Sequence, residues 1–597
     1  MTINRLAAAI RSAVLSARDN GDIILADESF PVKLEMPPSK QFGDYSCNIA
    51  LTLKKLTDVK DSRQLAAIIR NRLGDADGLI ERTEIAGHGF INLYLHPEWL
   101  HNTLHRIEEE GERYGTSSAR KGEKVLIEFV SANPTGPISV VNGRAAALGD
   151  ALANLLASQG SSVSREFYVN DALNSLQLEL FSKTVQIRYL QQLGHPVRMP
   201  DDTLEPGVNS EKELPVVQFP QNGYLGEYVR EIAKEIVTHT GEKFHRRLIE
   251  ANQSDLAEAE LFFRDYTLES ILTSQRNALE AFGVNFDKFF FESSLYESGE
   301  VDDVISALNE RGCTYERDGA LWLKSSEFGD DEDRVLVRSN EKATYIAADA
   351  AYHKNKYSRG FNHLIDIFGA DHHGYIARLK ASISALGYQV ESLDVILTQM
   401  ISLLRDGEAV IGGKRKGTVI ELKEDLIDDI GRDAARFYFL LNSYDTPATV
   451  DVELARRQSN ENPVYYVQYA HARLCSILRR SAEQGATIKP SSEADLSLLI
   501  HTREQDVLRK LNDYPAELAN AAERYAPHRL TRYAIDLSGL LNLFYENCRV
   551  LSGTEETVPP ELTTARLCLV NGSRITLRNL LSILGISAPE RMDRSGD

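Results

Sequence analysis

The stretch KVLIEFVSANPTGPISVVNGRAAALGDALANLL, residues 124–156, decides the fold. Residues 124–130 form a short apolar run that is typical of a buried parallel strand, and the run at 163–171 predicts a second strand. Between them, apolar residues recur at the spacing of one helix face: Val141, Ala145, Leu148, Leu152 and Leu155. Strand, Gly/Pro turn, helix and strand form a βαβ unit. Its turn, at 132–137, lies where a nucleotide phosphate would meet the helix N-terminus.

Downstream of this unit, strand and helix signals first alternate and then give way to helix signals alone. The alternation of strand and helix signals continues at 344–353, 363–375 and 395–404, which extends the α/β core. Beyond about residue 450 the strand signals fade. Three segments there have the periodicity of amphipathic helices and predict a helical domain: 464–482, 491–524 and 528–552.

Upstream of the unit, residues 1–110 mix helix and strand signals. Leu6, Ile10 and Val14 share one helix face, whereas FINLYLH at 90–96 is strand-like. This mixture predicts a small α+β module, and the charged stretch 108–124 predicts the linker that follows it.

Length and charge limit the class of protein. The chain has 597 residues, which corresponds to about three to five domains. Hydrophobic residues make up 43% and charged residues 26% of the chain, so it can bury several cores. The net charge of −20 argues against a protein that coats nucleic acid or an anionic membrane. A local basic patch remains possible.

Cysteine spacing and hydropathy predict a cytoplasmic protein. The five cysteines are far apart and form no CxxC or Cys/His cluster, so neither a tightly bound metal nor a disulfide framework is expected. Arg5 and Arg11 interrupt the N-terminal apolar segment, and no apolar run of 18 residues occurs. We therefore expect a protein that is soluble, is not exported and does not contact a membrane.

A series of longer blocks makes a resemblance specific. They include EFVSANPTGP (128–137), YVNDALN (168–174), FGADHHGY (368–375), NPVYYVQYAHARLCSIL (462–478) and a terminal APERM (588–592). In composition and order these blocks resemble the class I arginyl-tRNA synthetases over nearly the whole chain. The resemblance implies an α/β Rossmann-type catalytic core with an N-terminal α+β module and a C-terminal all-α anticodon-binding domain.

The same resemblance implies four regions. Residues 1–115 would form the module that contacts the tRNA elbow, and 116–385 the catalytic core with its insertions. Residues 386–450 would form a stem-contact segment with a KMSKR-like loop, and 451–597 the helical anticodon-binding domain.

The implied chemistry has two steps. Arginine and ATP would give arginyl-adenylate and pyrophosphate, and the arginyl group would then move to the terminal adenosine of tRNA. The expected partners are tRNA-Arg, L-arginine and ATP, with Mg²⁺ accompanying ATP and no resident protein metal. We expect a monomer.

Both class I signatures are altered. Where the family has His-x-Gly-His, this chain has Ser139-Val140-Val141-Asn142, and where it has KMSKR the chain has 411–415, Ile-Gly-Gly-Lys-Arg. A serine hydroxyl and a neutral amide supply no cationic donor to the α-phosphate, and Val141 puts a branched side chain where adenine lies against a glycine. Leu173 replaces a further glycine of the family.

The resemblance nevertheless assigns roles to the residues present. The catalytic candidates are Ser139, Asn142 and Lys414, of which Lys414 would hold the leaving pyrophosphate. The candidates for binding ATP are Pro134, Thr135, Gly136, Val141, Gly369 and Lys414.

The arginine pocket is expected to be intact. The resemblance places Glu128 and Asn133 at the amino acid, and Tyr345 and Asp349 at the guanidinium, for which a planar carboxylate is the natural partner. Asp371 and His372 would line the same pocket.

For tRNA, the candidates are Phe90, Asn92, Tyr469 and Arg473. The alternatives are ordinary core and strand roles for Phe90 and Asn92, and helix packing for the tyrosines around 465–469.

Two functions fit these observations. The first is an arginine–tRNA ligase that works with altered signatures, with the help of a basic group such as Lys124. The second is an adenylation-impaired paralogue that binds arginine and tRNA, regulates, or acts on a modified substrate.

Overall fold

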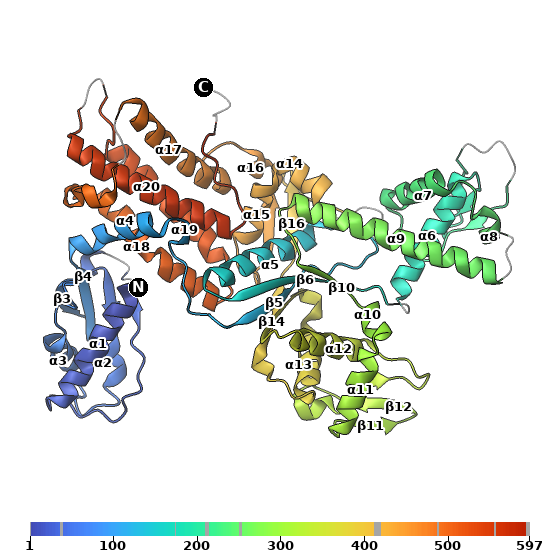
Figure 1. Cartoon of the computed structure of the whole chain (residues 1–597), viewed down its shortest axis with the longest axis horizontal. Coiled ribbons are helices and arrows are strands. Elements are labelled where there is room, and N and C mark those ends of the chain that lie inside the picture. The colour runs from blue at the N-terminus through green and yellow to red at the C-terminus, as the bar shows by residue number, and fades with distance from the viewer. Residues whose placement is uncertain are drawn as a thin grey trace.

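The computed structural model describes residues 2–35, 37, 40–172, 175–208, 214–249, 253–410, 419–485, 489–553 and 557–592. A sheet at the centre of the molecule joins three outlying parts (Figure 1). The N-terminal module lies below the C-terminal helices, one insertion extends to the right of the view, and a second lobe lies beneath the sheet.

The central sheet is parallel, and its strand order creates a ligand-binding crevice. The order is β10 (Lys288–Phe291), β6 (Ser162–Val169), β5 (Lys124–Glu128), β14 (His363–Gly369) and β15 (Leu393–Thr398). From β5, the chain passes through α5 (Val140–Ser158) to β6 on one side, whereas β14 lies on the other. In such sheets ligands bind outside the carboxyl ends of the strands at this switch point.

Helix α5 is buried on nearly all sides. It contacts β5, β6 and β14 on one side and helices of the C-terminal domain on the other. Its buried residues therefore include Arg144 as well as the predicted apolar face. Arg144 donates to the carbonyl oxygens of Gln399, Ser443 and Thr446, which ties α5 to the segments after β15 and α15 (Arg432–Leu440).

The N-terminal module has a core of its own. The antiparallel sheet has the order β1 (Leu34–Glu35), β2 (Tyr45–Cys47), β4 (Phe90–Leu95), β3 (Ile80–Ala86). Three helices accompany it: α1 (Thr2–Asp19), α2 (Ile49–Leu53) and α3 (Ser62–Arg72). Helix α4 (Pro97–Glu110) instead contacts helices of the C-terminal domain, and its Leu100, Leu104 and Ile107 belong to the main core.

Two insertions leave the sheet. Between β6 and β10 lie α6 (Leu176–Gln192), α7 (Glu227–Thr240), α8 (His245–Ile249), the long α9 (Gln253–Ala281) and short strands β7 (Val197–Arg198), β8 (Leu204–Glu205) and β9 (Val217–Gln218). Between β10 and β14 lie α10 (Ser293–Glu297), α11 (Glu300–Glu310), β11 (Thr314–Arg317), β12 (Ala320–Leu323), β13 (Arg334–Val337) and α12 (Tyr345–Ser358). The alternating segment 344–353 is thus the start of helix α12.

After β14, helix α13 (Ile376–Ala385) packs Leu379 and Ile383 against the sheet. The apolar segment 395–404 forms two strands, because the chain turns at Gln399–Met400 between β15 and β16 (Ile401–Arg405). The rest of this region contains β17 (Glu408–Val410), α14 (Asp428–Ile430), β18 (Ala448–Asp451) and α16 (Val452–Arg456).

The C-terminal domain is helical, as predicted. It contains α17 (Pro463–Glu483), α18 (Thr502–Glu523), α19 (His528–Asn547) and α20 (Pro560–Ile583). The predicted helix 491–524 begins only at Thr502, because His501 accepts a hydrogen bond from Arg503 N–H and Glu504 accepts one from His501 N–H. These bonds cap the helix. In the described part of the chain, no helix is long and apolar enough to cross a membrane.

Candidate active site

A cavity of about 640 Å³ opens at the carboxyl ends of β5, β14 and β15. Most residues that the resemblance assigned to arginine or ATP line this central cavity, as does the catalytic candidate Asn142: Glu128, Asn133, Val141, Tyr345, Asp349, Gly369 and His372. They come from four separate parts of the chain, and the switch point of the sheet brings them together.

The turn after β5 has a strained backbone at the cavity wall. Val130 has φ of 69° and Ser131 has φ of 35°, which is uncommon for residues with a side chain and especially for a β-branched one. In this conformation Ser131 Oγ donates to Glu128 Oε1 at 3.0 Å and accepts from Tyr168 N–H at 3.1 Å. The turn therefore orients Glu128. Such strain is frequent at binding sites.

A buried lysine balances the charge of Glu128. Lys356 Nζ donates to Glu128 Oε2 at 2.7 Å and to Asp366 Oδ1 at 2.8 Å, and Asp366 Oδ2 also contacts His353 Nε2 at 2.7 Å. Burial raises the pKa of Glu128, and the ammonium group of Lys356 opposes this effect. Glu128 thus already has a cationic partner without arginine.

The other end of the cavity carries two carboxyl groups, Asp349 and Glu292, that form no ion pair with a cation of the described residues. Burial and the neighbouring charges of Glu292 and Glu128 raise the pKa of Asp349, and Tyr375 donates its hydroxyl proton to Asp349. Burial and Asp171 raise the pKa of Glu292 to about 7. Glu292 is 2% exposed, and its Oε2 has no hydrogen-bond partner among the described residues. This acidic end therefore suits a cationic group.

Glu292 was missed by the sequence analysis. It directly follows the apolar strand β10, and the carboxyl ends of parallel strands share one edge of the sheet. That position in KFFFESS could have indicated it. Asp171, which follows β6, holds the neighbouring turn by accepting from Ser293 N–H at 2.9 Å and Ser293 Oγ at 2.7 Å.

The N-terminus of α5 contacts the segment that follows the KMSKR-like loop. Val140 N–H donates to Ile420 O at 3.1 Å, and Leu422 N–H donates to Ile138 O at 2.8 Å. The first altered signature is therefore adjacent to Ile420 and Leu422, which follow the second signature in the sequence. Ser139 Oγ donates to Asn142 Oδ1 at 2.8 Å, so the two residues in the histidine positions bond to each other.

Several predicted ATP contacts do not reach the cavity. Pro134, Thr135 and Gly136 are buried in the turn and do not line the cavity. Their carbonyl groups have structural partners, because Thr135 O accepts from Tyr228 at 3.0 Å and Gly136 O from Gln275 at 2.8 Å. The structure thus places these three residues outside the cavity lining, and their contact with ATP stays a prediction.

Asp371, Ser139 and Lys124 also lie outside the cavity lining. The Asp371 side chain is 85% exposed and close to His372. Lys124 begins β5, so it lies at the amino end of the strand and cannot replace a cation at the carboxyl end. Arg378 of α13 does line the cavity, and its Nε has no hydrogen-bond partner in the described part of the chain. Lys414 and Leu173 lie outside the described residues.

The tRNA candidates differ in exposure. Tyr469 and Arg473 line a groove on the helical domain together with Arg479, Arg480, Tyr545 and Arg591. The Arg473 guanidinium lies 4.9 Å from the ring centre of Tyr469 and 4.4 Å from that of Tyr545. Phe90 is 37% exposed. Asn92 is 3% exposed and accepts from Ser46 at 2.8 Å, so a contact with a tRNA base, as predicted for it, does not fit the structure.

Family models match three parts of the chain. The "Arginyl tRNA synthetase N terminal domain" matches residues 4–95, "tRNA synthetases class I (R), catalytic domain" matches 225–452, and the "DALR anticodon binding domain" matches 467–592. Arginine–tRNA ligases of Desulforamulus reducens and Carboxydothermus hydrogenoformans are each 43% identical to this chain. The alignments cover 98% of both chains for the first and 99% of both chains for the second. The chain belongs to the arginyl-tRNA synthetase family.

Solved structures agree with this family. A putative arginyl-tRNA synthetase from Campylobacter jejuni has a TM-score of 0.71 and 30% identity, covering 83% of this chain and 100% of that one. The Thermus thermophilus arginyl-tRNA synthetase has a TM-score of 0.71 at 22% identity and covers 99% of this chain and 100% of that one. The predicted fold class, a Rossmann-type core with an N-terminal module and a helical anticodon-binding domain, is confirmed.

The catalytic-domain match begins at residue 225, after Ser139–Asn142. The matched range therefore does not include the altered first signature. Among the described residues, no group of three or more His, Cys, Asp or Glu side chains could hold a metal ion.

Proposed function

We propose that the chain is an arginine–tRNA ligase that activates arginine with ATP and transfers it to tRNA-Arg. The observation that carries this proposal is the acidic end of the central cavity, where no cation of the described residues pairs with Asp349 or Glu292 as Lys356 pairs with Glu128. Full-length similarity to curated arginine–tRNA ligases supports it independently.

The two ends of arginine would occupy separate parts of this cavity. Its guanidinium would face Asp349 and Glu292, since a planar cation can bind a carboxylate through two hydrogen bonds. Its amino group would approach Glu128 and Asn133, on the other part of the cavity wall. The carboxylate of arginine would then be held near α5, where it can attack the α-phosphorus of ATP and displace pyrophosphate.

ATP would meet the N-terminus of α5. The free N–H groups and the dipole of a helix N-terminus favour phosphate. Asn142 can add an amide donor there, and we propose that Arg378 and Lys414 supply the positive charge that the replaced histidines do not. Mg²⁺ would arrive with the phosphates of ATP, because it usually binds proteins through few direct ligands.

For tRNA, we propose the arginine-rich groove of the helical domain around Tyr469 and Arg473. An arginine that stacks between two tyrosine rings is suited to unpaired bases. We also propose a cytoplasmic monomer, which is supported by the family and by the absence of disulfide spacing.

Aminoacylation with labelled arginine tests the proposed function. Purified protein should charge tRNA-Arg in the presence of ATP and Mg²⁺, and should not charge it with lysine. The altered first signature favours a second candidate, a paralogue that binds arginine without activating it. Arginine binding without any aminoacylation or tRNA-dependent pyrophosphate exchange would support that candidate.

A further inference from the structure

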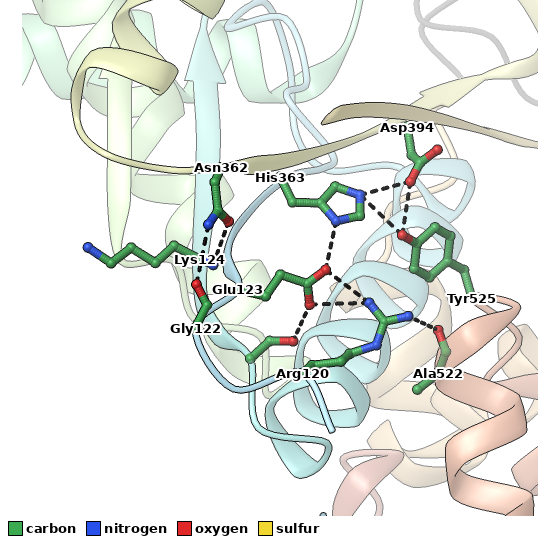
Figure 2. A network of polar contacts seen from close by, with 10 residues as sticks. Arg120, Gly122, Glu123, Lys124, Asn362, His363, Asp394, Ala522 and Tyr525 are labelled. Atoms are coloured by element: carbon green, nitrogen blue, oxygen red, sulfur yellow. Dashed lines mark hydrogen bonds and ion pairs between the residues drawn. The ribbon is translucent and has the colours of Figure 1, made fainter. Parts of the chain in front are cut away.

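His363 occupies the amino-terminal edge of the central sheet, opposite the cavity. It begins β14, and its ring lies between Glu123, which precedes β5, and Asp394, in β15 (Figure 2). Nδ1 is 2.9 Å from Glu123 Oε1, and Nε2 is 2.8 Å from Asp394 Oδ2. Tyr525, which follows α18 of the helical domain, donates to the same Asp394 oxygen at 2.9 Å.

This geometry favours a doubly protonated ring. A neutral imidazole has one N–H donor and one acceptor nitrogen, whereas a carboxylate only accepts. A carboxylate oxygen lies within 2.9 Å of each ring nitrogen, so the doubly protonated ring donates to both, and the Tyr525 hydroxyl also lies 3.2 Å from Nε2. The ring is 16% exposed, so water competes only weakly for these contacts. Loss of one proton would therefore set a nitrogen lone pair against a carboxylate.

The surrounding charges fix the two carboxylates. Arg120 contacts both oxygens of Glu123, at 3.1 and 3.2 Å, and donates to Ala522 O in α18 at 3.4 Å. Ser161 donates to Glu123 Oε2 at 2.6 Å. Near Asp394, Lys380 of α13 adds positive charge, and Tyr444 is close enough for Asp394 to contribute to its raised pKa.

The direction of the titration agrees with the geometry. Burial alone would lower the pKa of His363, but its hydrogen bonds to Asp394 and Glu123 outweigh burial and raise the pKa. Burial would raise the pKa of Asp394, yet the bonds from His363 and Tyr525 lower it. Both carboxylates are thus ionised while the ring is protonated, and their charges favour the doubly protonated ring.

The contact joins the helical domain to the strands of the active site. Tyr525 has φ of 50°, an unusual conformation for a bulky residue that its tertiary contacts must stabilise. The three strands at this edge run to the cavity, where they end near Glu128, Gly369 and Thr398. A change in the contact between the helical domain and this edge can therefore shift the strands whose other ends form the cavity.

We propose that His363, as an imidazolium between Glu123 and Asp394, is a positioning residue that fastens the helical domain to the sheet, and that loss of its proton weakens this attachment. Below we call these contacts the His363 bridge. Its predicted effect on catalysis rests on the proposed ligase function, whereas its existence does not.

Thermal unfolding at several pH values tests the bridge without any substrate. A group with a raised pKa stabilises the fold fully below its unfolded value, about 6.5, and loses that effect as the pH rises through the folded value. Wild type should therefore exceed His363→Gln by about 2 °C at pH 6, and the difference should vanish by about pH 9. His363→Lys, which keeps a charge throughout, should show no such decline.

The control is His239→Gln, which removes a histidine of the insertion whose Nδ1 lies 2.9 Å from the Tyr266 hydroxyl. His239→Gln should change the unfolding temperature by the same amount at all pH values. A His363→Gln deficit that is independent of pH, or that grows as pH rises, would refute a charged bridge and leave an ordinary packing role.

NMR of ¹³C-labelled histidine in the intact chain gives a second measurement that does not depend on variant stability. The resonance that is lost in His363→Gln identifies His363, and its midpoint should lie above 6.5. A midpoint below that value would overturn the proposal even if every variant folds.

The catalytic consequence has its own readout. In tRNA-dependent pyrophosphate exchange at pH 7, His363→Gln should raise the KM for tRNA about threefold, with the KM for arginine unchanged. His363→Lys should restore the wild-type value. If the chain has no ligase activity, exchange is absent in all variants, while unfolding and NMR still decide on the bridge. If exchange is robust and unaffected, the bridge does not position the site.

Discussion

At the scale of residues, we expect Asp349 and Glu292 to determine which amino acid the cavity accepts. Asp349→Asn should weaken arginine binding about tenfold to a hundredfold, because an amide cannot offer two acceptor oxygens to the guanidinium. Wild type should bind lysine far less well than arginine, since an ammonium group cannot make the paired contact. Isothermal titration calorimetry measures both. Asp371→Asn, the same change at an exposed carboxyl nearby, is the matched control and should leave binding unchanged.

The pH dependence of arginine binding follows from Glu292. Its pKa of about 7 means that the free cavity holds a proton below neutrality, and the guanidinium must displace that proton. Affinity should therefore rise about tenfold between pH 6 and pH 8, with proton release near pH 6 and little at pH 8. Calorimetry in buffers of different ionisation enthalpy detects this release. Glu292→Gln should reduce the pH dependence to the part that comes from Asp349, whose pKa is also raised, and a flat wild-type profile would argue against a proton on Glu292.

At the scale of elements, we predict that the N-terminus of α5 limits adenylation. Ser139 and Asn142 bond to each other there, and exposed Val141 lies in the cavity wall. One missing transition-state donor typically costs about 10²–10³ in rate. If these positions are limiting, native protein should show weak tRNA-dependent pyrophosphate exchange, and Ser139→His, Val141→Gly and Asn142→His together should increase it.

Repair is expected to be partial, because Leu173 and the 411–413 segment would remain altered. Arginine affinity, which depends on the other end of the cavity, serves as the internal control and should not change. Strong exchange by native protein that the triple substitution lowers would show that this chain activates arginine without the imidazoles.

Elements whose pattern is local were predictable, and contacts between distant elements were not. The apolar run at β5 and the periodicity of α5 define the βαβ unit directly, and the edge of a parallel sheet then predicts where a site lies. In contrast, Arg378 lines the cavity from helix α13, and no local pattern reveals which face of that helix meets the cavity. The buried turn at Thr135 and Gly136 is held by Tyr228 and Gln275, which are remote in sequence.

At the scale of the whole molecule, an acidic chain must concentrate positive charge to bind tRNA. The groove with Arg473, Arg479, Arg480 and Arg591 provides one such concentration within a net charge of −20. Because phosphate contacts release counterions, affinity for tRNA-Arg should fall steeply between 50 and 200 mM salt, by about 10² or more. Arg473→Gln should reduce the affinity, as measured by fluorescence titration. Absence of binding at low salt would remove tRNA as a partner.

Removal of the N-terminal module separates tRNA binding from arginine binding. The module has its own core and meets α18 through Arg509 and Asp44, and through Tyr45 and Asp513, which are 2.9 Å apart. Helix α4 packs in the main core, so the deletion must end before it, at residue 96, and not at 110. Without residues 1–96, tRNA affinity should fall by about tenfold, while calorimetry should show arginine binding within twofold of wild type, because every residue lining the central cavity remains.

Deletion of 1–110 is the informative contrast: it removes Leu100, Leu104 and Ile107 from the core and should lower thermal stability as well. Equal tRNA affinity before and after the shorter deletion would show that the module does not contact tRNA.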